Sequence, residues 1–192
     1  MTESAASPTT PTHVVITTAP LDVVLGRLGE EAPVGRLDGW TVAALSPRVV
    51  SFPTPAAQRV SAAGERVFAV LDTGHDVGLC VATGRSAQFM VWSPGWQAPS
   101  GKELDRFAKG WRQLAHAMAS LAGHPENAEA LAQTLDAPGF QGHGMPLDVT
   151  LDHARALLGV PASVMGISAD SFEPLTDVAV AAPRKRGLFG RR

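Results

Sequence analysis

The residues best suited to chemistry lie in one short segment, Asp72-Thr73-Gly74-His75-Asp76. Two carboxylates and an imidazole are the groups that general acid–base catalysis uses most often. An apolar run, residues 67–71, precedes the segment, and a second run, residues 77–82, follows it. The pattern predicts a β-hairpin with these polar residues at its tip. We therefore take Asp72, His75 and Asp76 as the catalytic candidates of a small hydrolase.

The four residues Leu71-Asp72-Thr73-Gly74 resemble the active-site turn of aspartic proteases, in which an apolar strand delivers Asp-Thr-Gly into a loop. In that family two such aspartates share one proton and activate water. The family places Ser or Ala after the glycine, whereas this chain has His75. The alternative interpretation is that Asp, Thr and Gly occupy the loop because they favour turn conformations.

The other residues that could bind metal or act as nucleophiles form no recognised pattern. The six histidines include no HExxH sequence and no pair four residues apart. The single cysteine, Cys80, lies inside an apolar run, which predicts a buried and unreactive thiol. The sequence also has no Gly-rich phosphate-binding motif. We therefore expect neither a metal site nor a cofactor.

Two further residues suit an interface with a partner protein. Trp92 and Trp96 flank a Pro-Gly pair that follows an apolar run, and Arg85 lies in the turn before that run. Tryptophan and arginine are the side chains that most often dominate binding at protein interfaces. Because Trp92 ends an apolar run, we expect it in the core. Trp96 and Arg85 are the partner-binding candidates.

The last ten residues, 183–192, form a basic tail without an acidic residue. Five of the 16 Lys and Arg residues lie there, which leaves 11 in the rest of the chain against 18 Asp and Glu. An acidic body repels phosphate, so we expect no nucleic-acid binding by the folded domain. The tail itself suits an anionic membrane surface or RNA. Its candidate residues are Arg184, Lys185, Arg186, Phe189, Arg191 and Arg192.

Length and composition predict a soluble, cytoplasmic protein with one domain. A chain of 192 residues with 45% hydrophobic content buries enough surface to fold without disulfides or metal. One cysteine excludes an intramolecular disulfide, and the polar start of the chain lacks the basic and apolar regions of a signal peptide. No apolar run approaches the roughly 18 residues of a membrane span.

The pattern of apolar runs predicts an α+β fold. Three runs within residues 66–92, separated by short Gly-containing breaks, are typical of an antiparallel meander. We expect a mixed or mainly antiparallel sheet centred on this meander, covered by a helix over residues 101–122 and by smaller C-terminal helices. The domain is predicted to span 13–175, with a disordered arm (1–12) and a flexible tail (176–192). Further strands are expected at 13–17, 40–44, 48–52 and within 165–175, and further helices at 21–28, 56–63, 125–135 and 151–158.

The helix over residues 101–122 is the best-defined element. Apolar residues recur on one face at spacings of three and four, and a capping box (Ser100 and Glu103) and Gly123 mark its ends. Small alanines flank the apolar stripe where a dimerising coiled coil usually carries charges. We therefore interpret it as an internal helix laid across the sheet and expect no function on it. Its stripe consists of Leu104, Phe107, Trp111, Leu114, Met118 and Leu121.

Because no convergent set of acid, base and nucleophile is evident, the leading hypothesis is a non-enzymatic binding or regulatory protein that acts through protein–protein contact. The first alternative is a small hydrolase that uses the Asp72-His75-Asp76 loop. The second is a peripheral adaptor whose basic tail contacts an anionic membrane or RNA.

Overall fold

The computed structural model of the chain describes residues 11–46, 54–92, 102–136 and 146–183. A seven-stranded sheet forms its centre, in the order β6-β5-β4-β1-β3-β2-β7, and all neighbouring strands are antiparallel. The predicted α+β class with an antiparallel sheet is thereby confirmed. The strands are β1 (Thr12–Thr17), β2 (Ala32–Leu37), β3 (Trp40–Ala44), β4 (Arg66–Asp72), β5 (Val77–Thr83), β6 (Ser86–Trp92) and β7 (Thr176–Ala181).

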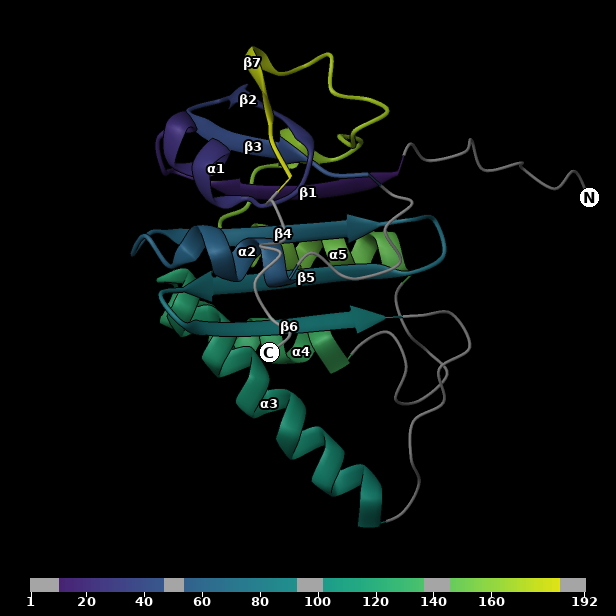
Figure 1. The fold of residues 1–192 in the computed structure, drawn as a ribbon. Helices are drawn as coiled ribbons and strands as arrows, with labels where there is room; N and C mark the ends of the chain where they lie inside the picture. The colour runs from purple at the N-terminus through teal and green to yellow at the C-terminus, as the bar shows by residue number, and fades with distance from the viewer. Residues whose placement is uncertain (1–10, 47–53, 93–101, 137–145, 184–192) are drawn as a thin grey trace, which may run out of the picture.

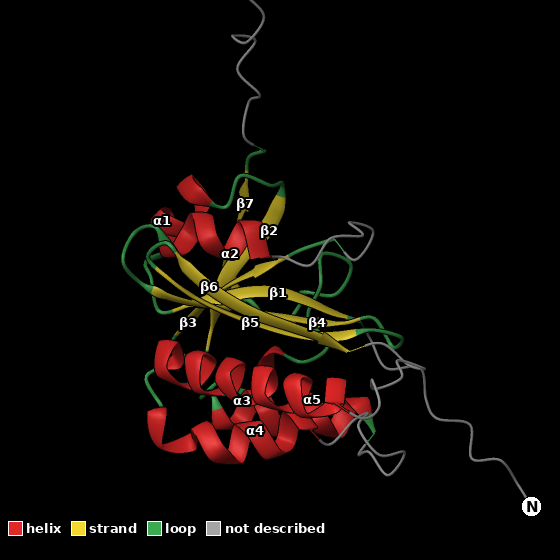
Figure 2. Cartoon of the chain, turned by 90° about the horizontal axis from the view of Figure 1, so that it is seen from below, coloured by secondary structure: helices red, strands yellow, loops and turns green. Residues whose placement is uncertain are grey.

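Helices cover both faces of the sheet (Figures 1 and 2). Two short helices lie on one face, and three helices form a layer on the other. The first group is α1 (Leu21–Arg27) and α2 (Thr54–Ser61); the second is α3 (Lys102–Ala122), α4 (Ala128–Asp136) and α5 (Leu147–Leu157). Short 3₁₀ turns, Pro125–Asn127 and Ala162–Val164, precede α4 and follow α5.

Alternating residues of the central strands contribute to two separate cores. Ile16, Phe68 and Leu79 pack toward α3, α4 and α5, whereas Val15 and Cys80 belong to the core on the side of α1 and α2. Successive side chains of a strand point to opposite faces, so a strand covered on both sides must be apolar throughout. This requirement explains the continuous apolar runs of β1, β4 and β5, which are buried almost along their whole lengths.

The folded part of the chain is longer than the sequence predicts. Residues 176–181, expected in the flexible tail, form the edge strand β7, and Thr12, expected in the arm, is buried in β1. The strand expected within 165–175 is not present; an isolated bridge between Ser168 and Ser171 occurs there instead. The predicted strand at 48–52 lies outside the described residues.

Strand β2 was not predicted, because Pro33 and Gly35 interrupt its apolar pattern. It pairs with β3 through a two-residue turn, Asp38-Gly39, in which both residues have positive φ (48° and 84°). These angles define a type I′ turn, the connection that best fits the twist of a hairpin. Gly35 lies where β7 approaches closely, since a Cβ there would be 2.7 Å from the carbonyl oxygen of Thr176.

Helix α3 covers only part of the sheet. In Figure 1 its C-terminal half lies behind β5 and β6, whereas its N-terminal half continues beyond β6, the last strand. Burial decreases in the same direction: Ala115 and Met118 are fully buried, whereas Trp111 and Leu114 are only partly buried. The prediction of a helix laid across the sheet therefore describes its C-terminal half alone.

Three helices end in the same way, with a glycine in the left-handed region and a terminal carbonyl bound by another element. The glycines are Gly29, Gly123 and Gly159. A left-handed glycine is the usual end of a helix because it carries no Cβ. The side-chain donors connect the layers and satisfy carbonyl groups that the helix leaves open. The bonds are Arg59 Nε to Leu28 O (2.7 Å), Arg66 Nε to Leu121 O (2.9 Å) and Asn127 Nδ2 to Leu157 O (2.8 Å).

Substituting Ala for two glycines of the α3 region is expected to have opposite effects. Gly123 has φ +77°, and a Cβ there would collide with the Arg66 guanidinium, so Gly123→Ala should destabilise the fold by about 2 kcal/mol. Gly110 lies within α3 with open space around it, so Gly110→Ala should stabilise by about 0.5–1 kcal/mol. Urea unfolding measures both changes; equal effects of the two substitutions would contradict the described helix end.

Candidate functional site

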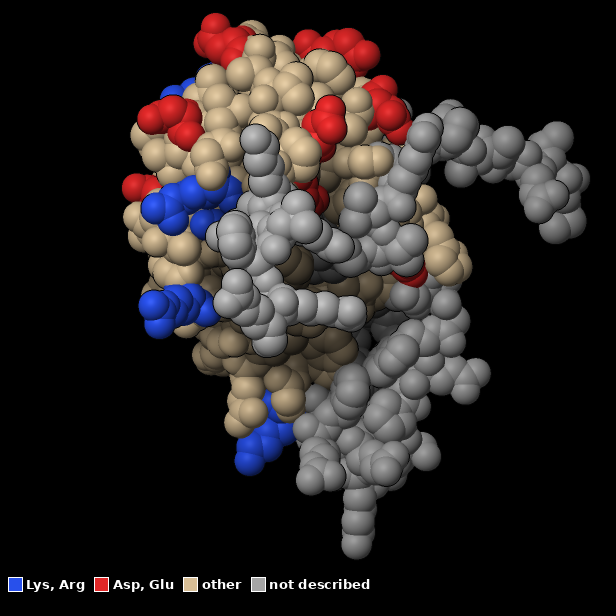
Figure 3. Space-filling model, viewed as in Figure 1, with Lys and Arg blue, Asp and Glu red and all other residues tan. Residues whose placement is uncertain are grey.

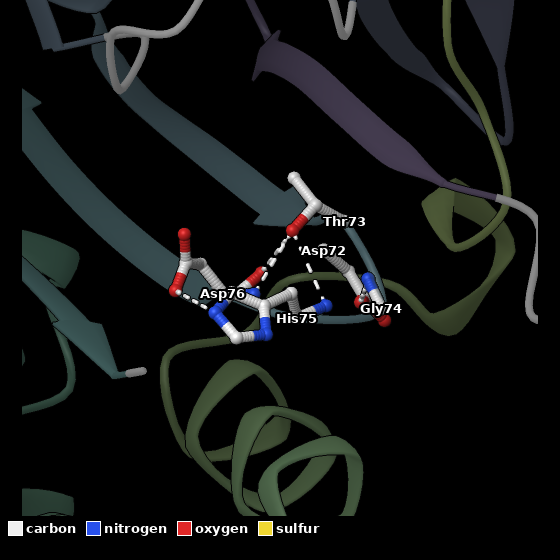
Figure 4. Close-up of polar contacts among 5 residues, drawn as sticks. All are labelled: Asp72, Thr73, Gly74, His75 and Asp76. Carbon is white, nitrogen blue, oxygen red and sulfur yellow. Dashed lines mark hydrogen bonds and ion pairs between the residues drawn. The ribbon is translucent and has the colours of Figure 1, made fainter. Parts of the chain in front are cut away.

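The Asp72–Asp76 segment forms the turn between β4 and β5 (Figure 4). The Gly74 N–H donates to Asp72 Oδ1 (2.8 Å), and the Asp76 N–H donates to Thr73 Oγ1 (2.9 Å). The Thr73 N–H also donates to the Asp76 carbonyl oxygen (3.0 Å). Side chains of Asp and Thr stabilise turns through such bonds to nearby backbone groups. The loop therefore uses its polar groups to hold its own conformation.

The three catalytic candidates do not converge on a common point. The His75 side chain is 73% exposed, and its Nε2 lies 4.0 Å from Oδ1 of the neighbouring Asp76. The Asp72 carboxylate instead faces Gly74, on the other side of the loop (Figure 4). General acid–base catalysis needs its groups within hydrogen-bond reach of one reacting atom. The loop gives the hydrolase hypothesis no such geometry.

The outer strand β6 presents an apolar surface on one face. Phe89 is 53% exposed and Val91 is 40% exposed, whereas the intervening Met90 and the following Trp92 are buried against the α3 side. Of the partner-binding candidates, Arg85 is exposed in the two-residue turn that leads into β6. Trp96 lies outside the described residues. Phe89 and Val91 were not among the predicted partner-binding residues, although their alternation with Met90 and Trp92 indicates a strand covered on one face only.

Backbone groups of β6 also face outward. Thr83 and Ser86 flank the two-residue turn Gly84-Arg85, and such a flanking pair is hydrogen-bonded in a tight hairpin. Because hydrogen-bonded and non-hydrogen-bonded pairs alternate, Ala87 and Val91 direct their N–H and C=O groups away from β5. No further strand pairs with β6 within the part of the chain that the structure describes. Strand β6 is therefore the last strand at this edge of the sheet among the described residues.

An open groove of about 460 Å³ lies between α4 and α5. Alanine and leucine side chains make up much of its lining, together with Gln133, Thr134 and His153. The Thr134 hydroxyl donates to the carbonyl oxygen of Ala130 one turn earlier in α4 (3.0 Å). The groove brings together no acid–base pair. Among the described residues, no three His, Cys, Asp or Glu side chains are placed to hold a metal ion.

Cys80 is buried in β5 on the side of α1 and α2. Burial raises the pKa of its thiol to about 12. A nucleophilic or metal-binding cysteine must be a thiolate, which a raised pKa disfavours near neutral pH. Cys80 therefore acts as a core residue.

His13 is a buried titratable residue that bonds to three other segments of the backbone. The backbone N–H of His13 donates to the carbonyl oxygen of Ile167 (2.9 Å), and its backbone carbonyl accepts from the N–H of Leu45 (2.7 Å). The ring Nδ1 lies 2.9 Å from the carbonyl oxygen of Ser46. Burial lowers the pKa of the imidazole below its ordinary value of 6.5, while the bond to Ser46 and the charge of Glu30 oppose that shift. Its Nε2 has no hydrogen-bond partner among the described residues. The backbone of His13 thus joins β1 to Leu45 and Ile167, and its ring contacts the carbonyl oxygen of Ser46.

Within the described ranges, no helix is both long enough and apolar enough to cross a bilayer. Comparison of the chain with models of known protein families, with curated proteins and with solved structures found no match.

His13 is expected to make the stability of the fold depend on pH. Because its pKa is lowered in the folded state, the unfolded chain binds the proton first. Stability should be complete above about pH 6.5 and fall as the pH decreases toward the folded-state pKa, by at most about 1.4 kcal/mol per pH unit. Urea unfolding at several pH values gives the change of the unfolding free energy with pH. The variant His13→Asn, which keeps a donor for Ser46, should remove the contribution of His13 to this change. If the unfolding free energy of the variant depends on pH as that of the wild type does, His13 is not the cause of the pH dependence.

Proposed function

We propose that this chain is a non-enzymatic binding protein that receives an extended segment of a partner protein at the outer edge of β6. The observation that carries the proposal is the uncharged strand β6, the last described strand at its edge of the sheet, which leaves Val91 and part of Phe89 exposed and lies beside the projecting half of α3. Adding a strand to an exposed edge is a common mode of peptide recognition, in which backbone bonds provide affinity and side-chain contacts provide specificity.

Within the described ranges, strand β6 lacks the charge, proline and bulge by which proteins usually protect a sheet edge. Its seven residues pair with β5 without a bulge, and none of them is charged or proline. Natural edge strands are usually shortened, bulged, charged or covered, because an open apolar edge pairs with other chains. Burial of the remaining exposed surface of Phe89 and Val91 would contribute roughly 1 kcal/mol each, about half the value for a fully exposed side chain.

The opposite edge of the sheet is less suited to pairing. Strand β7 carries Asp177 with a positive φ (52°), and its pairing with β2 is irregular between Val34 and Arg36. Acidic side chains gather at this end of the molecule, at the top of the view in Figure 3. Both charge and irregularity disfavour strand addition. This edge exposes Val178 and Val180, which makes it a suitable internal control for β6.

The projecting half of α3 provides cover for an added strand. Figure 2 shows that α3 stays in the helical layer, and Figure 1 shows that it passes beyond β6 within that layer. A strand placed next to β6 would therefore have one face against α3, in the same way that Met90 and Trp92 are covered. This arrangement gives α3 a role in binding that the sequence analysis did not expect.

The remaining expectations stay part of the proposal. We place the protein in the cytoplasm, as the sequence favours, and expect no nucleic-acid binding by its acidic body. The tail residues 184–192 lie outside the described residues, so the adaptor alternative gains no structural support. The turn geometry of Asp72–Asp76 favours binding over hydrolysis.

Placing a lysine on the β6 edge should abolish partner binding. Val91→Lys introduces a charge into the apolar surface, the same device by which natural edges avoid pairing. Val180→Lys places the same charge on the β7 edge and is the matched control. Affinity capture from the native lysate with quantitative mass spectrometry should show proteins retained by the wild type and by Val180→Lys but reduced at least about tenfold by Val91→Lys.

Equal capture by all three baits would show that the bound proteins use another surface. The melting temperatures of both variants should stay close to that of the wild type, because Val91 and Val180 are both exposed.

A further inference from the structure

We propose that the segment bound at β6 is an extended peptide that runs antiparallel to β6, with a basic residue toward its amino end and an acidic residue toward its carboxyl end. This inference rests on the proposed function and names the chemistry of the ligand. Two oppositely charged residues at the ends of the edge, Arg85 and Asp76, together with the position of α3 carry it.

Arg85 marks one end of the edge. It is exposed in the turn immediately before Ser86, and it forms no ion pair with another described residue. A strand added beside β6 lies about 4.8 Å away. Arg85 lies in the turn and not in the strand, so its long side chain would reach a peptide residue just beyond Ser86, and an aspartate or glutamate there would form an exposed ion pair.

Asp76 marks the other end. It precedes Val77, which pairs with Trp92 at the end of β6, and its side chain is 39% exposed. The nearest described basic atom is His75 Nε2, 4.0 Å from Asp76 Oδ1, and this contact is an ion pair only when the imidazole is protonated. An added strand lies two strand spacings, roughly 10 Å, from β5, so only a long side chain can reach this carboxylate. Lysine or arginine has both the length and the charge.

The direction of the peptide follows from the sheet. All described neighbours in the sheet are antiparallel, and antiparallel pairs form slightly stronger ladders than parallel ones. An antiparallel peptide places its carboxyl end beside Arg85, at the start of β6, and its amino end near Asp76. The outward backbone groups of Ala87 and Val91 then bond to it.

A second copy of the chain is a less suitable occupant of this edge than a peptide. Antiparallel pairing of two β6 strands in one continuous sheet brings the α3–α5 layers of both copies to the same face. The projecting half of α3 would then enter the space that the helices of the second copy need (Figure 1). A peptide without a helical layer of its own meets no such obstacle. The ligand is therefore an extended segment rather than another copy of this domain.

Two synthetic peptides with blocked termini test this inference by isothermal titration calorimetry with the full chain. Both alternate Val and Thr over seven central residues; one has Lys at the amino end and Glu at the carboxyl end, and the other has these two exchanged. The first should bind about fivefold more tightly, because exposed ion pairs contribute modestly. The double variant Arg85→Glu with Asp76→Lys should prefer the second peptide by a similar factor.

Equal affinity of the two peptides, or a preference that the double variant does not reverse, would overturn the inference. A doubled mass in light scattering that Val91→Lys abolishes would also overturn it, because a second copy would then occupy the edge. After any of these results, the proposed function stands if Val91→Lys still reduces the capture of cellular proteins, and only the ligand chemistry is then wrong. Loss of that dependence would instead count against the proposed function.

Discussion

Burial of β1, β4 and β5 on both faces is the constraint on which the rest of the structure depends. Side chains of one strand contribute alternately to two cores, so helices must cover each face of the sheet. The side-chain bonds at the helix ends connect these layers. Arg59 joins α2 to the end of α1, and Arg66 joins β4 to the end of α3. The two arginines therefore link the covering helices to one another and to the sheet.

Strand β6 is buried on one face only, unlike β1, β4 and β5, and its exposed face is the candidate binding surface. Met90 and Trp92 are buried on the α3 side, whereas Phe89 and Val91 remain partly exposed on the other. An exposed apolar edge strand pairs readily with other chains. Such an edge is therefore either a site of aggregation or a site that binds a partner strand. The projection of α3 past β6 favours binding of a partner strand, because an added strand would extend the sheet over the N-terminal half of α3 (Figure 1).

Most of the fold was predictable, because it depends on local patterns. The apolar runs of β4, β5 and β6 and the period of α3 identify these elements within a few residues. Strand β2 was not predictable, since Pro33 and Gly35 hide its pattern, and β7 is a short apolar run whose side chains are mostly exposed. The pairing of β2 with β7, which joins residues far apart in the chain, determines both strands. Local sequence carries little information about such a contact.

The candidate site was predicted in part. Arg85 was identified as a partner-binding residue and lies at the β6 edge, whereas the proposed roles of Phe89 and Val91 depend on the strand order, which the sequence does not show. Asp76 was selected for catalysis and is now proposed to attract a basic ligand residue. The chemistry of a residue is visible in sequence, but its neighbours across the sheet are not.

Amide hydrogen exchange, followed by NMR at single residues, tests the central claim most directly. Saturation with the peptide that carries Lys at its amino end should slow exchange at Ala87 and Val91, whose amides face outward. The amides of Gln88 and Met90, which bond to β5, should change little. Unchanged exchange at Ala87 and Val91, with the peptide bound elsewhere, would contradict strand addition at β6.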